Sequence, residues 1–540
     1  MQSVPKLGVW VAMLIAAFVV SALLALLNQA PSLDLRVIWQ DPYYRHVTQF
    51  SFYQSFLSTL LSVGLAIPVA HALSRRQFIG KALVLKLFAT TLVLPVLVGV
   101  FGLLEIYGRS GWLATQLAQW DLSLPFNIYG LHGILLAHLF FNLPYAARLL
   151  LQSLESIPAE QHKLCAHLGM GHWQKFKWVE WPRMRQQLAP VCGLVFMLCF
   201  TSFATVMALG GGPKSTTIEL AIYQAIKFDF DLQAGALLAI WQMLLCGLMA
   251  LSIQRFARPI AISMGSDAPT ALVVKDSLFS KCWDGAWIGF SLLLVLPPLG
   301  MVLTSGMNPQ ALGVLSDGRF WSALGASLKV ASMASVIAVS AGTAILLSSR
   351  RLRLNQREKT ADKIELLGTI ILVTPGLVIS TGLFLLLRSW TDALSYALVV
   401  VVAVNALMGL PYVIKTLAQP MLQLEQQYQY LCATLGIRGW RRLRVVEWRA
   451  LKRPLAHAFA ISFMFSMGDL SAIALFGSQE FRTLPLYLFQ LLGSYQMDAA
   501  AVVSVTLLLL SVGCFALMER LFRPRSASTP TNRSHYAHSQ

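Results

Sequence analysis

The segment LCAHLGMGHWQKFKWVEW, Leu164–Trp181, returns later in the chain as LCATLGIRGWRRLRVVEW, Leu431–Trp448. We call the first segment loop 1 and the second loop 2. Nine of the eighteen positions are identical, and each identical pair lies 267 residues apart. The same offset pairs Pro144 with Pro411 outside the loops. A repeat at one constant offset indicates that a single structural unit occurs twice in the chain.

The sequence around the two loops is apolar enough to lie in a membrane. Of the 540 residues, 56% are hydrophobic and 12% are charged, whereas about a quarter of the residues in a soluble domain are charged. A membrane-spanning helix needs about 20 apolar residues, and we expect twelve spans. They cover roughly residues 8–27, 52–73, 83–107, 130–153, 187–210, 233–254, 285–305, 324–348, 366–387, 394–417, 453–476 and 499–521. The predicted fold is an all-α polytopic membrane protein of two tandem six-helix halves.

The formal net charge is +18, and the distribution of Lys and Arg among the loops indicates the orientation of these spans. Lys and Arg are dispersed among the loops instead of gathering on one soluble face, so no nucleic-acid partner is expected. Cytoplasmic loops collect Lys and Arg, and this bias places loops 1 and 2, and both chain ends, in the cytoplasm. The apolar run 7–27 is longer than a signal-peptide core of about 7–15 residues. We therefore expect an uncleaved first membrane helix, surrounded by lipid.

Each loop is predicted to form a short helix, a break and a second short helix. Pro158 suits the start of the first helix in loop 1, where its missing N–H costs nothing. Gly169 and Gly436 suit a left-handed residue at the end of that helix. Because the pattern is kept twice at one surface, we interpret the loops as docking surfaces. An amphipathic segment on the bilayer interface, anchored by tryptophan, is the alternative.

The positions expected to couple the loops to a partner are the same in both copies. They are Cys165, Ala166, Gly169, Trp173 and Glu180 in loop 1, and Cys432, Ala433, Gly436, Trp440 and Glu447 in loop 2.

At these residues the chain resembles the inner-membrane permeases of ATP-binding-cassette importers. Their cytoplasmic "EAA" loop has Gly four residues after its second Ala, as in Cys165 to Gly169 and Cys432 to Gly436. The chain departs from that pattern at Lys163 and Tyr430, where the family has Glu. The resemblance implies the type I importer fold and a location in the bacterial inner membrane.

A narrower resemblance covers nearly the whole chain. Residues 196–231 and 476–495 are similar to the fused two-half permeases for thiamine and thiamine pyrophosphate, whose near cousins are ferric-iron permeases. The resemblance implies two copies of a cytoplasmic ATPase and one periplasmic thiamine-binding protein as partners. ATP and Mg would then be used by the ATPase, and this chain would bind no cofactor. Ferric iron remains the alternative substrate.

Other motifs do not indicate catalysis. The run Gly210–Thr216 has Pro213 where a phosphate-binding loop needs Gly before Lys, so we expect a tight turn. His162, His167 and His172 are five residues apart, which is not the spacing that places two imidazoles on one helix face. No catalytic or metal-binding residue is therefore predicted.

Asp469 is the candidate for the translocation path. An ionisable residue within a membrane span usually faces a cavity or a partner. A carboxylate there could contact the positive thiazolium ring of thiamine. A structural hydrogen bond to a neighbouring helix is an equally weighted interpretation.

A secondary transporter is the alternative from another class, because such chains also show six-plus-six symmetry. The loop 74–81 lacks the motif that the major-facilitator pattern places between spans 2 and 3.

We expect five regions along the chain. They are a first helix with its periplasmic loop (1–50), a first permease domain (51–255), a linker with the seventh helix (256–321), a second permease domain (322–520) and a disordered cytoplasmic tail (521–540).

Overall fold

The computed structural model describes residues 6–30, 36–256, 277–369, 371, 374–388, 393–437 and 439–521. Across these residues the regular elements are helices. The predicted tail, apart from its first residue, and most of the loop part of the predicted linker lie outside the described residues.

The first half of the chain forms a series of helices whose long members are apolar. Its main helices are α1 (Leu7–Gln29), α3 (Pro42–Arg75), α4 (Lys81–Val93), α5 (Val96–Tyr107), α6 (Trp112–Ala118), α7 (Leu131–Glu155), α8 (Ala159–His167), α9 (His172–Lys175), α10 (Trp181–Phe200), α11 (Phe203–Leu209), α12 (Ile218–Lys227) and α13 (Leu232–Phe256).

The second half repeats this order with fewer breaks. Its main helices are α14 (Leu278–Ser305), α16 (Gly318–Leu354), α17 (Glu358–Gly368), α18 (Gly376–Arg388), α19 (Ala397–Thr434), α20 (Gly439–Arg442), α21 (Trp448–Gly468), α22 (Ser471–Phe476), α23 (Leu484–Gly493) and α24 (Met497–Leu521).

Ten helices in the described part of the chain are long and apolar enough to cross a membrane, or eleven if one bent pair counts as a single span. The bent pair is α10 and α11, which meet at 51°. The expected ninth span, 366–387, is the exception, because its continuous helix α18 has only 13 residues. It begins directly after Pro375, and the residue before a proline is biased away from helix. Pro95 likewise separates α4 from α5 in the expected third span.

The first helix of each half packs against the other half. Helix α1 contacts α16, α17 and α18, whereas α14 contacts α3 and α5. Glycine permits both crossings: a Cβ on Gly102 of α5 would lie 2.4 Å from the Pro298 carbonyl oxygen of α14, and a Cβ on Gly382 of α18 would lie 2.3 Å from the Ala22 carbonyl oxygen of α1. The two contacts are equivalent by symmetry, so each half holds the other in place.

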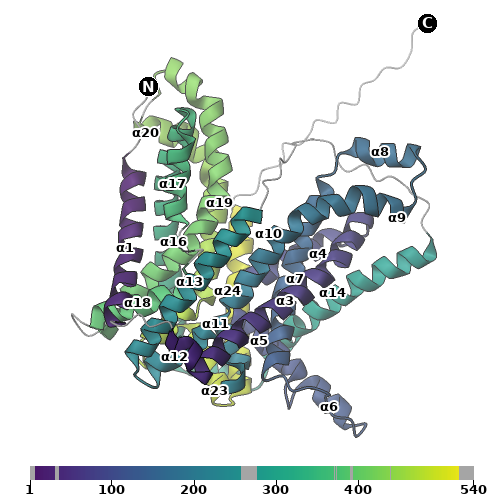
Figure 1. Ribbon diagram of the computed structural model, residues 1–540, viewed down its shortest axis with the longest axis vertical. Helices are drawn as coiled ribbons and strands as arrows, with labels where there is room; N and C mark the ends of the chain where they lie inside the picture. Colours follow the sequence, from purple (N-terminus) through teal and green to yellow (C-terminus); the bar gives the residue numbers. More distant parts are fainter. Residues whose placement is uncertain are drawn as a thin grey trace.

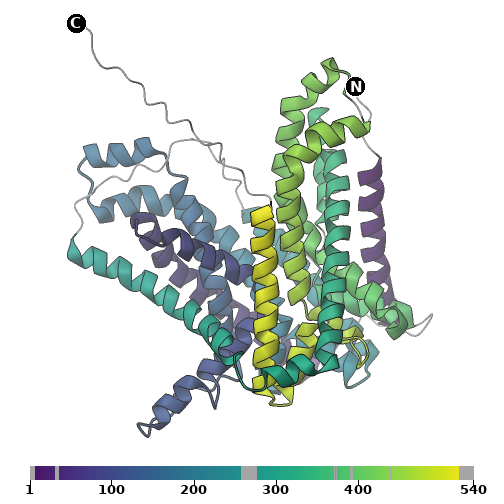
Figure 2. The same ribbon diagram turned by 180° about the vertical axis from the view of Figure 1, so that it is seen from behind.

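The helices form two arms that diverge from a common base (Figure 1). One arm contains α1, α16, α17, α19 and α20; the other contains α3, α4, α7, α8, α10 and α14. Figure 2 shows the same divergence from behind, with α24 between the arms. We call the end with α8 and α20 the loop end, and the end with α12 and α23 the joined end.

Candidate functional site

Loop 1 starts within α8, a helix that begins directly after Pro158 as predicted. The helix ends with two hydrogen bonds: the Gly169 N–H donates to the Ala166 carbonyl at 3.1 Å, and the Met170 N–H donates to the Cys165 carbonyl at 3.0 Å. This pair of bonds defines a Schellman motif, which needs a left-handed residue after the helix. Gly169 has φ +61°, so the predicted left-handed cap is confirmed.

Loop 2 ends its helix in the same way. The Gly436 N–H donates to the Ala433 carbonyl, and the Ile437 N–H donates to the Cys432 carbonyl. Gly436 has φ +63°, as predicted. The prediction of a separate short helix before Gly436 is wrong, because α19 continues without interruption to Thr434. The residue that corresponds to Pro158 in this half is Glu425, which donates a backbone N–H and does not interrupt a helix.

The second short helix also differs from the prediction. Helices α9 and α20 do not stand alone: each runs into a five-residue π-helix, Phe176–Glu180 in loop 1 and Leu443–Glu447 in loop 2. These π-helices continue directly into α10 and α21. They occupy equivalent positions, and π-helical turns are frequent at functional sites. Each loop is therefore joined continuously to the long helix that follows it.

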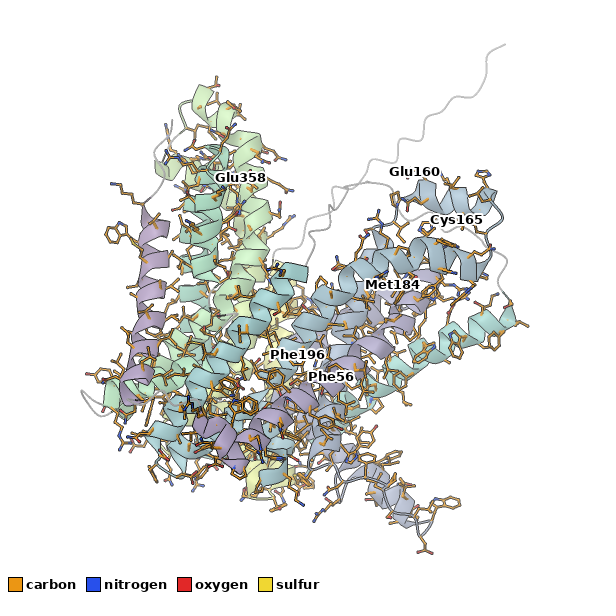
Figure 3. The ribbon with its side chains drawn as sticks, in the orientation of Figure 1. Phe56, Glu160, Cys165, Met184, Phe196 and Glu358 are labelled. Carbon is orange, nitrogen blue, oxygen red and sulfur yellow. The ribbon has the colours of Figure 1, made fainter. Side chains whose placement is uncertain are left out.

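The helix before each glycine shows an apolar face to the outside. Leu164 and Leu168 are exposed in loop 1, whereas Cys165 between them is buried. Leu431 and Leu435 are likewise exposed in loop 2 around the buried Cys432, and Ala166 and Ala433 are exposed beside them. Figure 3 shows Cys165 and Glu160 on α8 at the tip of one arm, and Glu358 on the other arm. Each arm thus presents exposed leucines at the loop end.

Trp173 is the most prominent aromatic side chain of loop 1. It is 73% exposed and stacks on Phe176 with ring centroids 5.8 Å apart. Phe176 in turn contacts the His71 ring of α3 edge-on. Trp440 has its backbone in α20, but its side chain lies outside the described residues.

The glutamates predicted for the loops are buried and anchored. In loop 1, Glu180 accepts from His71 Nε2 at 2.9 Å and pairs with Lys175 Nζ at 3.2 Å. Nearby, burial lowers the pKa of His162, and the Lys175 charge lowers it further while the Glu180 charge opposes the shift. This lowered pKa favours a neutral His162 at neutral pH.

In loop 2, Glu447 accepts from Arg350 Nη2 of α16 at 2.7 Å and pairs with Arg442 Nε at 3.3 Å. These basic partners of the two glutamates were not predicted from the sequence. Lys175 and Arg442 are equivalent residues of the two loops. The positive charge at this position in both loops is the sequence signal from which a basic partner for each glutamate could have been predicted.

The structure separates the predicted positions into three places. Loop 1 and loop 2 lie at the tips of different arms (Figure 1). Asp469 lies at the break between α21 and α22. Its Oδ1 accepts from the Ser471 N–H at 3.2 Å and from the Ser471 hydroxyl at 2.6 Å, and its Oδ2 accepts from the Ala472 N–H at 3.3 Å. Asp469 therefore caps α22, and its role in a translocation path stays a prediction.

A polar contact at the joined end links the two halves and was also missed. Lys227 at the end of α12 donates through Nζ to the carbonyls of Leu475 and Gly477, at 3.2 and 3.3 Å. These carbonyls lie at the end of α22, where a helix favours a positive charge. Nothing in the amphipathic pattern of α12 indicates which segment its last lysine would reach.

The run Gly210–Thr216 forms a turn after α11, as expected. Gly211 and Gly212 have φ +71° and +139°, and Pro213–Ser215 forms a single 3₁₀ turn. In the described part of the chain, no three His, Cys, Asp or Glu side chains group closely enough to hold a metal ion.

These features define a class of protein: a duplicated, multi-pass membrane permease with a matching exposed loop on each of two arms. The family model for inner membrane components of binding-protein-dependent transport systems matches residues 48–259 and 342–526. The chain belongs to this family, and it is a multi-pass protein of the inner membrane. Membership of this family rules out the alternative interpretation of the chain as a secondary transporter.

Individual relatives resemble the chain over most of its length. It is 49% identical to the thiamine transport system permease protein of Escherichia coli K12 over 519 residues, covering 95% of this chain and 96% of that protein. It is 42% identical to the protein of the same name from Haemophilus influenzae Rd, covering 95% of each chain. The corresponding protein of Brucella abortus strain 2308 is 40% identical, covering 88% of this chain and 87% of its own.

Proposed function

We propose that this chain is the permease subunit of an ATP-binding-cassette importer that carries thiamine, and thiamine pyrophosphate, into the cytoplasm. The observation that supports the substrate is the similarity along most of the chain to three thiamine transport system permease proteins, at 40–49% identity. The presence of both halves in one chain supports a complete translocation unit, because the family model matches twice.

The proposed partners follow from the two loops. One copy of a cytoplasmic ATPase binds loop 1 and a second copy binds loop 2, because two similar exposed surfaces fit two similar sockets. A periplasmic thiamine-binding protein delivers the substrate at the joined end. The loop end and both chain ends are then cytoplasmic. ATP and Mg are used by the ATPase, and this chain binds neither.

The residues that meet the ATPase are proposed to be those of the exposed faces. Leu164, Leu168 and Trp173 form the contact in loop 1, and Leu431 and Leu435 form it in loop 2. Buried Glu180 and Glu447 hold the loops in position instead of touching the partner. If the loops were interfacial anchors instead, changes in these residues would leave binding of the ATPase unaffected.

The test of the substrate is uptake by cells. A strain that cannot synthesise thiamine and lacks this chain should need more external thiamine for growth, and it should take up labelled thiamine slowly. Plasmid-borne expression of the chain should restore both. Ferric iron uptake serves as the control and should stay unchanged. Normal thiamine uptake together with impaired iron uptake in the deletion strain would assign the chain to the iron permeases.

A further inference from the structure

Four charged side chains form a closed ring beneath loop 2. Glu425 of α19 pairs with Arg442 Nη2 at 2.5 Å and with Arg350 Nε at 3.2 Å. Glu447 closes the ring, pairing with Arg350 Nη2 at 2.7 Å and with Arg442 Nε at 3.3 Å. Arg351 Nε adds an outer contact to Glu425 at 3.8 Å, and the four side chains of the ring are largely buried.

The ring joins three separate pieces of chain. Arg350 belongs to α16, Glu425 to α19, and the other two members belong to loop 2 itself. A buried charge that loses its partner is strongly destabilising, so these four groups resist separation. Each planar guanidinium bridges the two carboxylates and donates a hydrogen bond through Nη2, from Arg350 to Glu447 and from Arg442 to Glu425. Loop 2 is held to both helices by this network, in addition to its continuous backbone link to α19.

Loop 1 lacks this network although the loops share half of their residues. Pro158 occupies the position of Glu425, so the carboxylate that touches both arginines is missing. Glu180 keeps a two-contact anchor to His71 and Lys175. The same proline ends the helical continuity: α7 stops at Glu155 and α8 starts at Ala159, which leaves residues 156–158 as a non-helical link.

We propose that the Arg350–Glu425–Arg442–Glu447 ring makes loop 2, α16 and α19 move as one body, whereas loop 1 pivots at residues 156–158. The four ring members are positioning residues for transport, because they act through the loop that meets the ATPase. A movement of the ATPase is then transmitted to the membrane helices mainly through the second half. This inference rests on the proposed function only in that a nucleotide-driven partner binds the loops.

The two halves offer matched positions for measuring the two motions. His167 and Thr434 are equivalent exposed residues of the loops outside the proposed contact, and Leu60 of α3 and Val336 of α16 are exposed residues of the two arms. Spin labels are placed on the pair Leu60 and His167, and separately on the pair Val336 and Thr434, in a chain whose native cysteines are replaced by alanine. Distances are measured in the complex with the ATPase, without nucleotide and with bound ATP.

With the ring intact, the distance between Val336 and Thr434 should stay the same when ATP binds, while the distance between Leu60 and His167 changes. Glu425→Gln, which keeps the size of the side chain and removes its charge, should broaden the first distance and make it depend on nucleotide. Equal changes in both pairs of the wild type, no change in either pair, or an unaltered distance in Glu425→Gln would each overturn the proposal.

A second measurement separates coupling from simple loss of folding. In proteoliposomes with the ATPase and the binding protein, Glu425→Gln should hydrolyse several-fold more ATP per thiamine transported than wild type, with the ATPase still bound. Arg353→Gln is the matched control, since Arg353 is on the same helix as Arg350 and pairs with the more exposed Asp362 and Glu365; its ratio should match wild type. An unchanged ratio in Glu425→Gln would count against the ring. Failure of the wild type to carry thiamine, with the distance results as expected, would overturn only the proposed substrate.

Discussion

Gly169 and Gly436 show how a single residue sets the direction of a loop. Each follows a helix that must end, and each adopts the left-handed conformation that a side chain disfavours. A Cβ at either position would meet no atom within 4 Å, so space is not the reason for glycine. The reason is the backbone angle, which turns the chain from the exposed leucines toward the buried glutamate.

Gly169→Val and Gly436→Val should each weaken binding of the ATPase and lower uptake, while insertion into the membrane stays intact. Each substitution strains the left-handed cap by about 1 kcal/mol or more. Co-purification of the ATPase from detergent extracts measures the effect. The matched control is Asn at the same position, because Asn accepts the left-handed conformation. Val variants that retain the ATPase as well as the Asn variants do would show that the loops are not the coupling surface.

Asp469 offers a test of charge against shape. Asp469→Asn keeps the oxygen that accepts from Ser471 but removes the negative charge and the acceptor for the Ala472 N–H, whereas Asp469→Ala removes both acceptors, at a cost of about 1 kcal/mol. We expect the Asn variant to be more stable to heat than the Ala variant and to need a higher thiamine concentration than wild type for half-maximal uptake. The Ala variant should lose both stability and uptake. Wild-type uptake by Asp469→Asn would leave capping as the function of this carboxylate.

At the scale of elements, the exchange of α1 and α14 between the halves is the main packing feature. Each crosses a helix of the other half at a glycine, Gly382 for α1 and Gly102 for α14. Backbones approach closely at these points, and small residues are what permit such approach between membrane helices. The ends of α3 and α14 are also tied by Arg76 Nε, which donates to the buried Asp284 at 2.7 Å.

Gly102→Ala and Gly382→Ala should both destabilise the protein, because the new methyl group would lie within 2.5 Å of a backbone oxygen and force the helices apart. Overpacking of this kind typically costs about 1–3 kcal/mol. A lower midpoint in thermal unfolding of the detergent-solubilised protein measures it. Gly64→Ala in α3 is the control, since a methyl group there would meet no atom within 4 Å and alanine favours helix. Equal stability of all three variants would contradict the close crossings.

At the scale of the whole molecule, the two arms are joined at one end and separate at the other (Figures 1 and 2). Lys227 links α12 to α22 at the joined end, and the two loops are carried on different arms at the loop end. A force applied to both loops can therefore change the angle between the arms. That arrangement suits a permease that is driven by partners at the loop end.

The purified chain alone should hydrolyse no ATP, because its one glycine-rich run that resembles a phosphate loop has proline where glycine is needed. Hydrolysis should appear when the cognate ATPase is added and should increase further with the substrate-loaded binding protein. A phosphate-release assay on the three mixtures measures this. ATPase activity of the chain alone, surviving removal of contaminating ATPases, would contradict the proposed division of labour.

Much of the fold was accessible from the sequence because it depends on local or repeated signals. The duplication follows from the constant offset, and most of the spans follow from their length and hydrophobicity. The caps at Gly169 and Gly436 follow from one residue type after an amphipathic turn. Each of these signals lies within a few turns of helix, and the physical rule behind it acts over the same short range.

Only the tertiary structure decided what lies between distant segments. The exchange of α1 and α14, the contact of Lys227 with α22 and the burial of Glu180 and Glu447 depend on packing between residues far apart in the chain. Glu425 illustrates the difference. By sequence it is a glutamate where the other half has Pro158, and its helix continues for that reason. Its closure of a four-member ion-pair ring is visible only when α16, α19 and loop 2 meet, since a charge is paired by proximity in space and not by position in sequence.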